Sequence, residues 1–81
     1  MPESLDTLTS TEIRQIAGFG PLPEHLRARL LELGLDEGVE VERIAAGPIG
    51  GDPIAVRVGR TVIALRRALA RSVLLAPSGR A

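Results

Sequence analysis

His25 is the only imidazole in this 81-residue sequence, so it is the first candidate for acid–base or metal chemistry. A Ser–His–acid relay would need a nucleophile and an orienting carboxylate beside it. Nothing in the local sequence Pro-Glu-His-Leu-Arg suggests such a relay, and Glu24 cannot share a metal ion with His25, because adjacent residues of a helix point to different sides. The chain has no cysteine, which excludes a disulfide framework and a thiolate zinc site. We therefore expect an exposed His25 in a first helical turn, no metal site, no cofactor and no enzymatic activity.

A second candidate is the glycine-rich segment 47–53, Gly-Pro-Ile-Gly-Gly-Asp-Pro. A phosphate-binding P-loop needs a Gly-Lys-Ser/Thr sequence that leads into a helix. This chain has no lysine, and the residues after Pro53 have the pattern of a strand. The segment is therefore interpreted as an irregular, hairpin-like connection, with Asp52 as a turn-forming carboxylate rather than a general base.

Charge and aromatic content limit the choice of partner. Ten acidic residues balance ten arginines, and the chain has one Phe, no Tyr and no Trp. Zero net charge and the lack of aromatic platforms argue against a nucleic-acid binder. Asp52 is the last acidic residue, so the C-terminal part is locally basic, with Arg57, Arg60, Arg66, Arg67 and Arg71. A solvated arginine rim is the favoured interpretation, and an anionic partner is the alternative.

One helix is predicted at about residues 23–33. Pro23 suits the first helical position, and Gly34 can adopt the left-handed conformation that closes a helix. Leucines spaced by four, four and three residues form one apolar stripe that would cover the core: Leu22, Leu26, Leu30 and Leu33. Leu31 lies off this stripe, near Arg27: it is either an exposed leucine that suits a small interface or the edge of a wider core face.

The remaining apolar patterns predict five short strands. They fall at about 12–18, 39–44, 54–58, 61–65 and 72–76, and the slip in alternation at Arg43 predicts a bulge. Gly59-Arg60 is typical of a two-residue hairpin turn. The expected fold is mainly β: a small five-stranded barrel with one inserted helix, forming a single domain over 12–76. Residues 1–11 would be a loose lead-in and 77–81 a tail, with no targeting signal or membrane span.

Three groups of residues in this order and spacing resemble the FeoA (ferrous iron transport protein A) family. The first is Arg29-Leu30, Leu33-Gly34-Leu35, Gly38 and Val39-Glu40-Val41. The second is Pro48-Ile49-Gly50-Gly51-Asp52-Pro53-Ile54, with one glycine more than the family pattern. The third is Ala64-Leu65-Arg66, Ala70 and Val73-Leu74-Leu75, with Leu69 where the family commonly has an acidic residue. The resemblance covers residues 13–75.

The resemblance implies an SH3-like barrel, related to the C-terminal domain of iron-dependent repressors. It also implies a bacterial, non-catalytic accessory module of ferrous iron uptake that docks on the FeoB transporter, with transition-metal binding as a family-level property only. The module would be cytoplasmic, held at the inner membrane only through its partner, and its open strand edges would allow a homo-oligomer. The alternatives are a stand-alone regulatory barrel and a small nucleic-acid-binding barrel. The candidate partner-binding residues are Arg27, Leu31, Pro48, Ile49, Gly50, Gly51, Asp52, Arg66 and Arg67.

Overall fold

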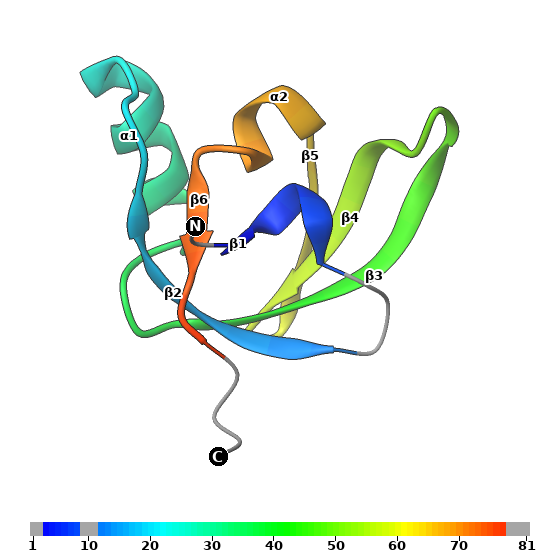
Figure 1. The fold of residues 1–81 in the computed structure, drawn as a ribbon, viewed down its shortest axis with the longest axis horizontal. Helices are drawn as coiled ribbons and strands as arrows, with labels where there is room; N and C mark the ends of the chain where they lie inside the picture. Colours follow the sequence, from blue (N-terminus) through cyan, green and yellow to red (C-terminus); the bar gives the residue numbers. More distant parts are fainter. Residues whose placement is uncertain (1–2, 9–11, 78–81) are drawn as a thin grey trace.

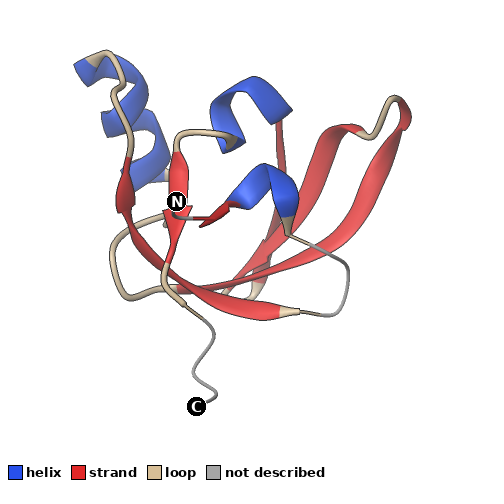
Figure 2. Cartoon of the chain, viewed as in Figure 1, coloured by secondary structure: helices blue, strands red, loops and turns tan. Residues whose placement is uncertain are grey.

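The computed structural model describes residues 3–8 and 12–77, without the side chains of Ala46, Pro48 and Ile49. Its elements are β1 (Glu3–Ser4), the 3-10 helix η1 (Leu5–Thr7), β2 (Ile13–Phe19), α1 (Glu24–Glu32), β3 (Glu40–Ile49), β4 (Asp52–Val58), β5 (Thr61–Leu65), α2 (Arg67–Ala70) and β6 (Val73–Leu75). The strands form one curled antiparallel sheet in the order β1-β6-β2-β3-β4-β5 (Figures 1 and 2). The architecture is the expected mainly β, SH3-like one with a single main helix. It has six strands rather than five, because the two-residue β1 pairs with β6.

The core is aliphatic, as the composition requires. Fourteen buried residues from every part of the described chain form one cluster: Leu5, Leu8, Ile16, Leu30, Leu35, Val41, Ile54, Val56, Val58, Ile63, Leu65, Ala70, Val73 and Leu75. Phe19, the one aromatic residue, only packs against its edge. Burial of branched aliphatic side chains contributes about 1.5–3 kcal/mol for each large one, so stability here depends on many small contributions.

The N-terminal segment differs from the expected loose lead-in. Within residues 3–8, Leu5 is completely buried and Leu8 nearly so. Their short 3-10 helix η1 packs against α2 and β6 and covers the open side of the curled sheet (Figure 1). The two leucines are too sparse for a helix or strand pattern, so local sequence alone did not reveal that they belong to the core. Residues 1–2 and 9–11 of the expected lead-in, and 78–81 of the expected tail, lie outside the described part.

The helix α1 agrees closely with its sequence signals. Pro23 is the N-cap residue, and Leu30 is the fully buried member of the leucine stripe. After the helix, Gly34 has φ = 96° and its N–H donates to the carbonyl of Leu31, while the N–H of Leu35 donates to the carbonyl of Leu30. This pair of bonds is the Schellman motif. It turns the chain so that Leu35 enters the core.

The β3–β4 hairpin is longer than the sequence predicts. The expected bulge is confirmed, because the pairing register shifts between Arg43 and Ala45. The segment expected as an irregular connection instead continues the sheet: β3 extends to Ile49 and β4 begins at Asp52. Gly50 and Gly51 form the two-residue tip with φ values of 64° and 76°, a conformation that glycine allows without strain. The two prolines suggested a loop, but a second register shift between Ala46 and Ile49 accommodates Pro48.

The predicted β4–β5 hairpin is confirmed. Val58 pairs with Thr61 across the two-residue turn Gly59-Arg60, and Gly59 has φ = 61°. After β5 the chain makes the short helix α2 and returns as β6 between β1 and β2.

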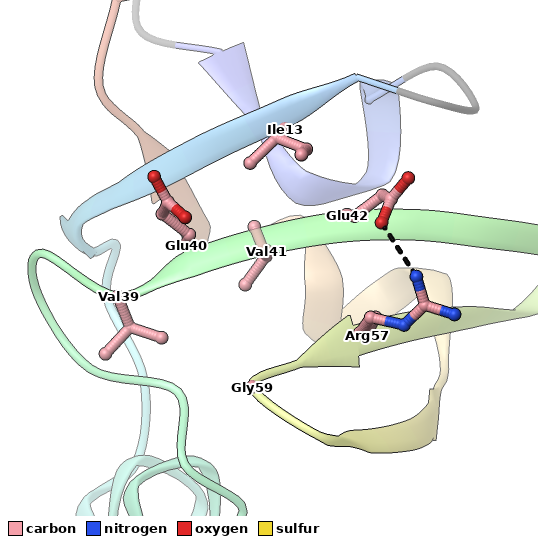
Figure 3. Close-up of a pocket in the computed structure, with 7 residues that line it drawn as sticks. All are labelled: Ile13, Val39, Glu40, Val41, Glu42, Arg57 and Gly59. Atoms are coloured by element: carbon pink, nitrogen blue, oxygen red, sulfur yellow. Dashed lines mark hydrogen bonds and ion pairs between the residues drawn. The ribbon is translucent and has the colours of Figure 1, made fainter.

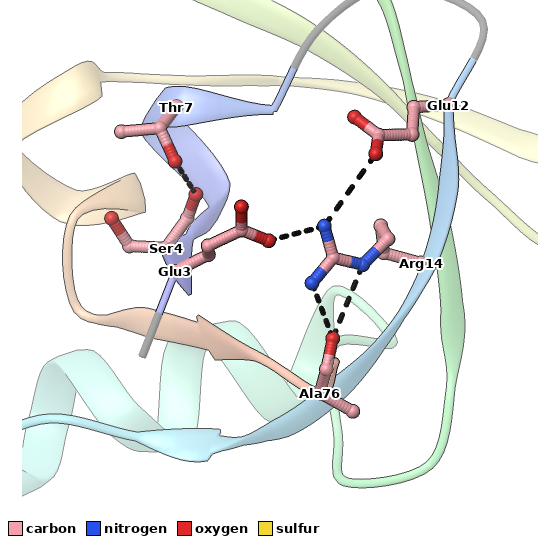
Figure 4. A network of polar contacts seen from close by, with 6 residues as sticks. All are labelled: Glu3, Ser4, Thr7, Glu12, Arg14 and Ala76. Carbon is pink, nitrogen blue, oxygen red and sulfur yellow. Dashed lines mark hydrogen bonds and ion pairs between the residues drawn. The ribbon is translucent and has the colours of Figure 1, made fainter. Parts of the chain in front are cut away.

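A buried arginine joins the two ends of the described chain (Figure 4). Arg14 on β2 is only 6% exposed, and its Nε and Nη2 both donate to the carbonyl oxygen of Ala76. Its Nη1 pairs with the carboxylate of Glu3 and lies 3.6 Å from that of Glu12. One planar guanidinium therefore holds β1, β2 and the end of β6 together, a geometry that lysine cannot reproduce.

We expect Arg14→Ala to lower the free energy of unfolding by about 2–3 kcal/mol, because it removes charge-assisted hydrogen bonds from a buried site. Arg14→Lys should fall between this variant and the parent. Urea denaturation followed by circular dichroism measures the difference. The control is Arg29→Ala, at an exposed arginine of α1, which should change the value by less than about 0.5 kcal/mol. Equal effects of Arg14→Ala and Arg29→Ala would contradict this role of Arg14.

Gly47 gives a second prediction. A Cβ placed on it would overlap the backbone oxygen of Asp52 on the facing strand, so Gly47→Ala must push the β3–β4 hairpin apart. The expected loss is about 1–3 kcal/mol in the same denaturation experiment. Gly18→Ala is the matched control: nothing lies within 4 Å of its added Cβ, and the substitution should be neutral or slightly stabilising. A neutral Gly47→Ala would show that the hairpin is not so closely packed.

Candidate functional site

The structure places the residues of the sequence-derived partner site on three separate parts of the fold. Arg27 and Leu31 belong to α1, residues 48–52 form the tip and inner end of the β3–β4 hairpin, and Arg66 and Arg67 begin α2. In Figure 1 α1, α2 and the hairpin tip all lie at the upper end of the molecule. A direct hydrogen bond joins segments 48–52 and 66–67. In the described part of the chain, no hydrogen bond or ion pair joins α1 to either segment.

The side chains of Asp52 and Arg67 form hydrogen bonds within the fold. An Asp52 carboxylate oxygen accepts a hydrogen bond from the backbone N–H of Arg67 at 3.0 Å, at the start of α2, where the N-cap residue Arg66 supplies no side-chain cap. Arg67 in turn donates from Nη2 to the backbone oxygen of Asp6 at 3.0 Å. Asp52 thus holds α2 to the hairpin, and Arg67 holds α2 to η1. This agrees with the expectation that Asp52 is a structural carboxylate, although it caps a distant helix rather than its own turn.

Asp6 completes this polar cluster under α2. Its side chain is 10% exposed, accepts a hydrogen bond from the hydroxyl of Ser4 and lies 3.5 Å from Nε of Arg71. Sequence reasoning did not identify Asp6, because nothing in the local pattern distinguishes it from a solvent-exposed acid. Only the packing of η1 on α2 brings it next to Arg71.

The side chains that stay available at this end are Leu31, Arg27 and Arg66. Leu31 is 40% exposed, which agrees with the first of its two sequence-based interpretations. Arg27 is exposed and its guanidinium carbon lies 5.8 Å from the centre of the Phe19 ring, within the range of a cation–π interaction. Arg66 is exposed at the N-cap of α2. These three side chains could contact an apolar and acidic surface.

The two turn residues of the β3–β4 hairpin offer a partner only backbone atoms, because both are glycines. Gly50 is exposed and Gly51 half-buried, and the side chains of Pro48 and Ile49 lie outside the described part of the structure.

His25 is exposed in the first turn of α1, as expected. Among residues 3–8 and 12–77, no group of three or more His, Cys, Asp or Glu side chains is placed to hold a metal ion. None of the described helices has the length and apolarity needed to cross a membrane.

A separate open pocket of about 350 Å³ lies on the outer side of β2, β3 and β4 (Figure 3). It is lined by Ile13, Val39, Glu40, Val41, Glu42, Arg57 and Gly59. The ion pair between Glu42 and Arg57, 3.1 Å long, crosses from β3 to β4 at its rim. None of these residues was among the sequence-derived candidates. They are spread over four segments, and only the strand register brings them together.

Comparison with known proteins gives a consistent result. The family model described as FeoA domain matches residues 3–77. The structure is similar to that of Stenotrophomonas maltophilia FeoA in complex with zinc, with a TM-score of 0.80 and 34% identity over 91% of this chain and 89% of that one. It is also similar to iron(II) transport protein A from Clostridium thermocellum, with a TM-score of 0.85 and 27% identity over 95% of this chain and 46% of that one.

A manganese-dependent transcriptional repressor shares the fold, with a TM-score of 0.79 but only 13% identity, over 93% of this chain and 42% of the repressor. No curated protein matches the chain. The family model includes residues 3–8, which agrees with the burial of Leu5 and Leu8. Because it matches all but the first two and last four residues, the chain belongs to the FeoA family.

Proposed function

We propose that this protein is a non-catalytic cytoplasmic accessory module of ferrous iron uptake that docks on a FeoB-type transporter and modulates its transport or assembly. Membership of the FeoA family carries this proposal. The Stenotrophomonas relative is itself described as a protein that possibly acts as a ferrous iron transport activating factor. The likeness to the manganese-dependent repressor concerns the fold alone and favours no second function.

The docking surface that we propose is the end of the barrel carrying α1, α2 and the β3–β4 tip. Its available side chains are Leu31, Arg27 and Arg66; arginine is enriched at protein interfaces, and the exposed Leu31, one helical turn after Arg27, adds apolar area. Asp52 and Arg67 support this surface from below by fixing α2. Gly50 and Gly51, the two turn residues of this hairpin, have no side chains, so a partner could approach the backbone of the turn closely.

The test is an NMR titration of the labelled full chain with the cytosolic GTP-binding domain of FeoB from the same organism, with and without nucleotide. We expect saturable shifts at Arg27, Leu31 and Arg66. Leu31→Lys should weaken binding by at least about tenfold, because it places an ammonium in the centre of the contact. Arg66→Glu should weaken binding and remove part of its salt dependence.

The matched control is Val62→Lys, which exchanges another exposed aliphatic residue for lysine, on the outer face of β5. It should leave the affinity unchanged. Equal weakening by Leu31→Lys and Val62→Lys would refute this choice of surface. The absence of shifts at saturating concentration would remove direct docking on that domain and redirect the search to the membrane portion of FeoB.

A further inference from the structure

The outer face of the sheet carries a row of four side chains with a particular order. The register makes Ile13 on β2 the direct neighbour of Glu42 on β3, Glu42 that of Arg57 on β4, and Arg57 that of Val62 on β5. Direct cross-strand partners project from the same face of a sheet. The row therefore reads aliphatic, acidic, basic, aliphatic, and its two end residues are 58% and 53% exposed.

A second row on the same face consists of three alanines. Ala45, Ala55 and Ala64 are cross-strand neighbours on β3, β4 and β5, and none of them is buried. The bulge between Arg43 and Ala45 puts Ala45 on the outer face, in line with the other two. Small side chains beside the charged row allow another surface to approach this part of the sheet closely.

The order of the first row is self-complementary. Consider two copies that face each other across a two-fold axis that is parallel to the strands and lies over the middle of the β3–β4 pair. This axis places β3 of one copy opposite β4 of the other, and β2 of one copy opposite β5 of the other. When two copies meet through this face, Glu42 of each lies opposite Arg57 of the other, and Ile13 lies opposite Val62. The same operation places Ala45 opposite Ala55. Such an isologous contact, in which residue i meets j and j meets i, is the usual form of a symmetric dimer interface.

The pocket supplies a further complementary pair. Val41 and Val58 are cross-strand partners. Their neighbours Glu40 and Gly59 therefore also lie close together, and both line the pocket. This places Glu40 beside the Gly59-Arg60 turn. Neither Glu40 nor Arg60 forms an ion pair with another described residue. The two-fold axis brings Arg60 of the second copy over Glu40. The apolar walls formed by Ile13 and Val39 suit the stem of an arginine side chain.

We propose that this outer face, formed by β2 to β5, is the interface of a two-fold symmetric homodimer. Each cross-dimer acid then meets a base, and the two Glu42–Arg57 ion pairs combine into a network of four alternating charges, which is worth more than an isolated surface pair. Zero net charge means that the copies do not repel each other as they approach. A strongly basic or acidic partner would find only half of this face complementary, whereas a second copy matches all of it.

The decisive experiment combines two single charge reversals, Glu42→Arg and Arg57→Glu. In a homodimer of either variant, like charges face each other twice across the axis, so sedimentation velocity should show monomers. In an equimolar mixture, the two positive charges of one variant face the two negative charges of the other, so dimers should form again. A defect in the folding of either variant cannot produce this recovery.

The parent protein should shift from the 8.6 kDa monomer towards twice that mass as the concentration rises to about 1 mM, and less so at high salt. Val62→Lys, which leaves the charged pair intact, should abolish the shift, while Leu31→Lys on α1 should retain it. A parent that stays monomeric throughout would overturn the proposal. So would a dimer that survives Val62→Lys, or a mixture of the two reversals that stays monomeric. Leu31 on α1 and Val62 on β5 belong to different elements. A result that refutes the dimer therefore leaves the transporter proposal unaffected, and a result that refutes docking on the transporter leaves the dimer proposal unaffected.

Discussion

The closure of the curled sheet is the constraint on which the rest of this fold depends. β1 and β5 occupy the two ends of the strand order, and within the described residues these two strands do not pair with each other. The space between them is filled by side chains: Leu5 and Leu8 from the segment around η1 and Ala70 from α2 all belong to the buried cluster. Since the chain has no cysteine and only one aromatic residue to stabilise a small core, the loss of these contacts would remove a large part of its stability. Two directional interactions then hold the two ends of the described chain in place. Arg67 of α2 donates a hydrogen bond to the backbone oxygen of Asp6, and the guanidinium of Arg14 donates to the carbonyl oxygen of Ala76.

This closure also explains why polar residues of the C-terminal half are not all available for a partner. The sequence places Asp52 and Arg67 fifteen positions apart, without any visible reason for them to interact. In the fold, Asp52 caps α2 and Arg67 reaches η1, so both help to place the end of the barrel where Leu31, Arg27 and Arg66 remain exposed. The hydrogen bonds of a polar side chain therefore tell whether it holds the surface in place or remains available to contact a partner.

Local chemistry made much of the fold predictable from sequence. The leucine stripe and Gly34 define α1, Gly59-Arg60 defines the β4–β5 turn, and the broken alternation at Arg43 marks a real bulge. Each of these signals arises from residues within a few positions of one another. The burial of Leu5, the capping role of Asp52 and the neighbours of Arg14 depend on contacts between distant parts of the chain, which no local pattern contains. The same holds for the outer-face row, because Ile13, Glu42, Arg57 and Val62 become neighbours only when the register of four strands is known.

The two proposed surfaces are geometrically related. A two-fold axis parallel to the strands preserves the direction in which each strand runs along that axis. The β3–β4 tip and α2 lie together at one end of β4 and β5, as the hydrogen bond between Asp52 and Arg67 requires. A dimer formed through the outer face therefore carries both copies of this end side by side, facing the same way. Two weak contacts presented in this manner act as one stronger contact when the partner offers two sites within reach, because the second contact forms at a high effective concentration. On the proposed dimer, the small surface of Leu31, Arg27 and Arg66 would therefore bind a partner with two such sites more tightly than it would on a monomer.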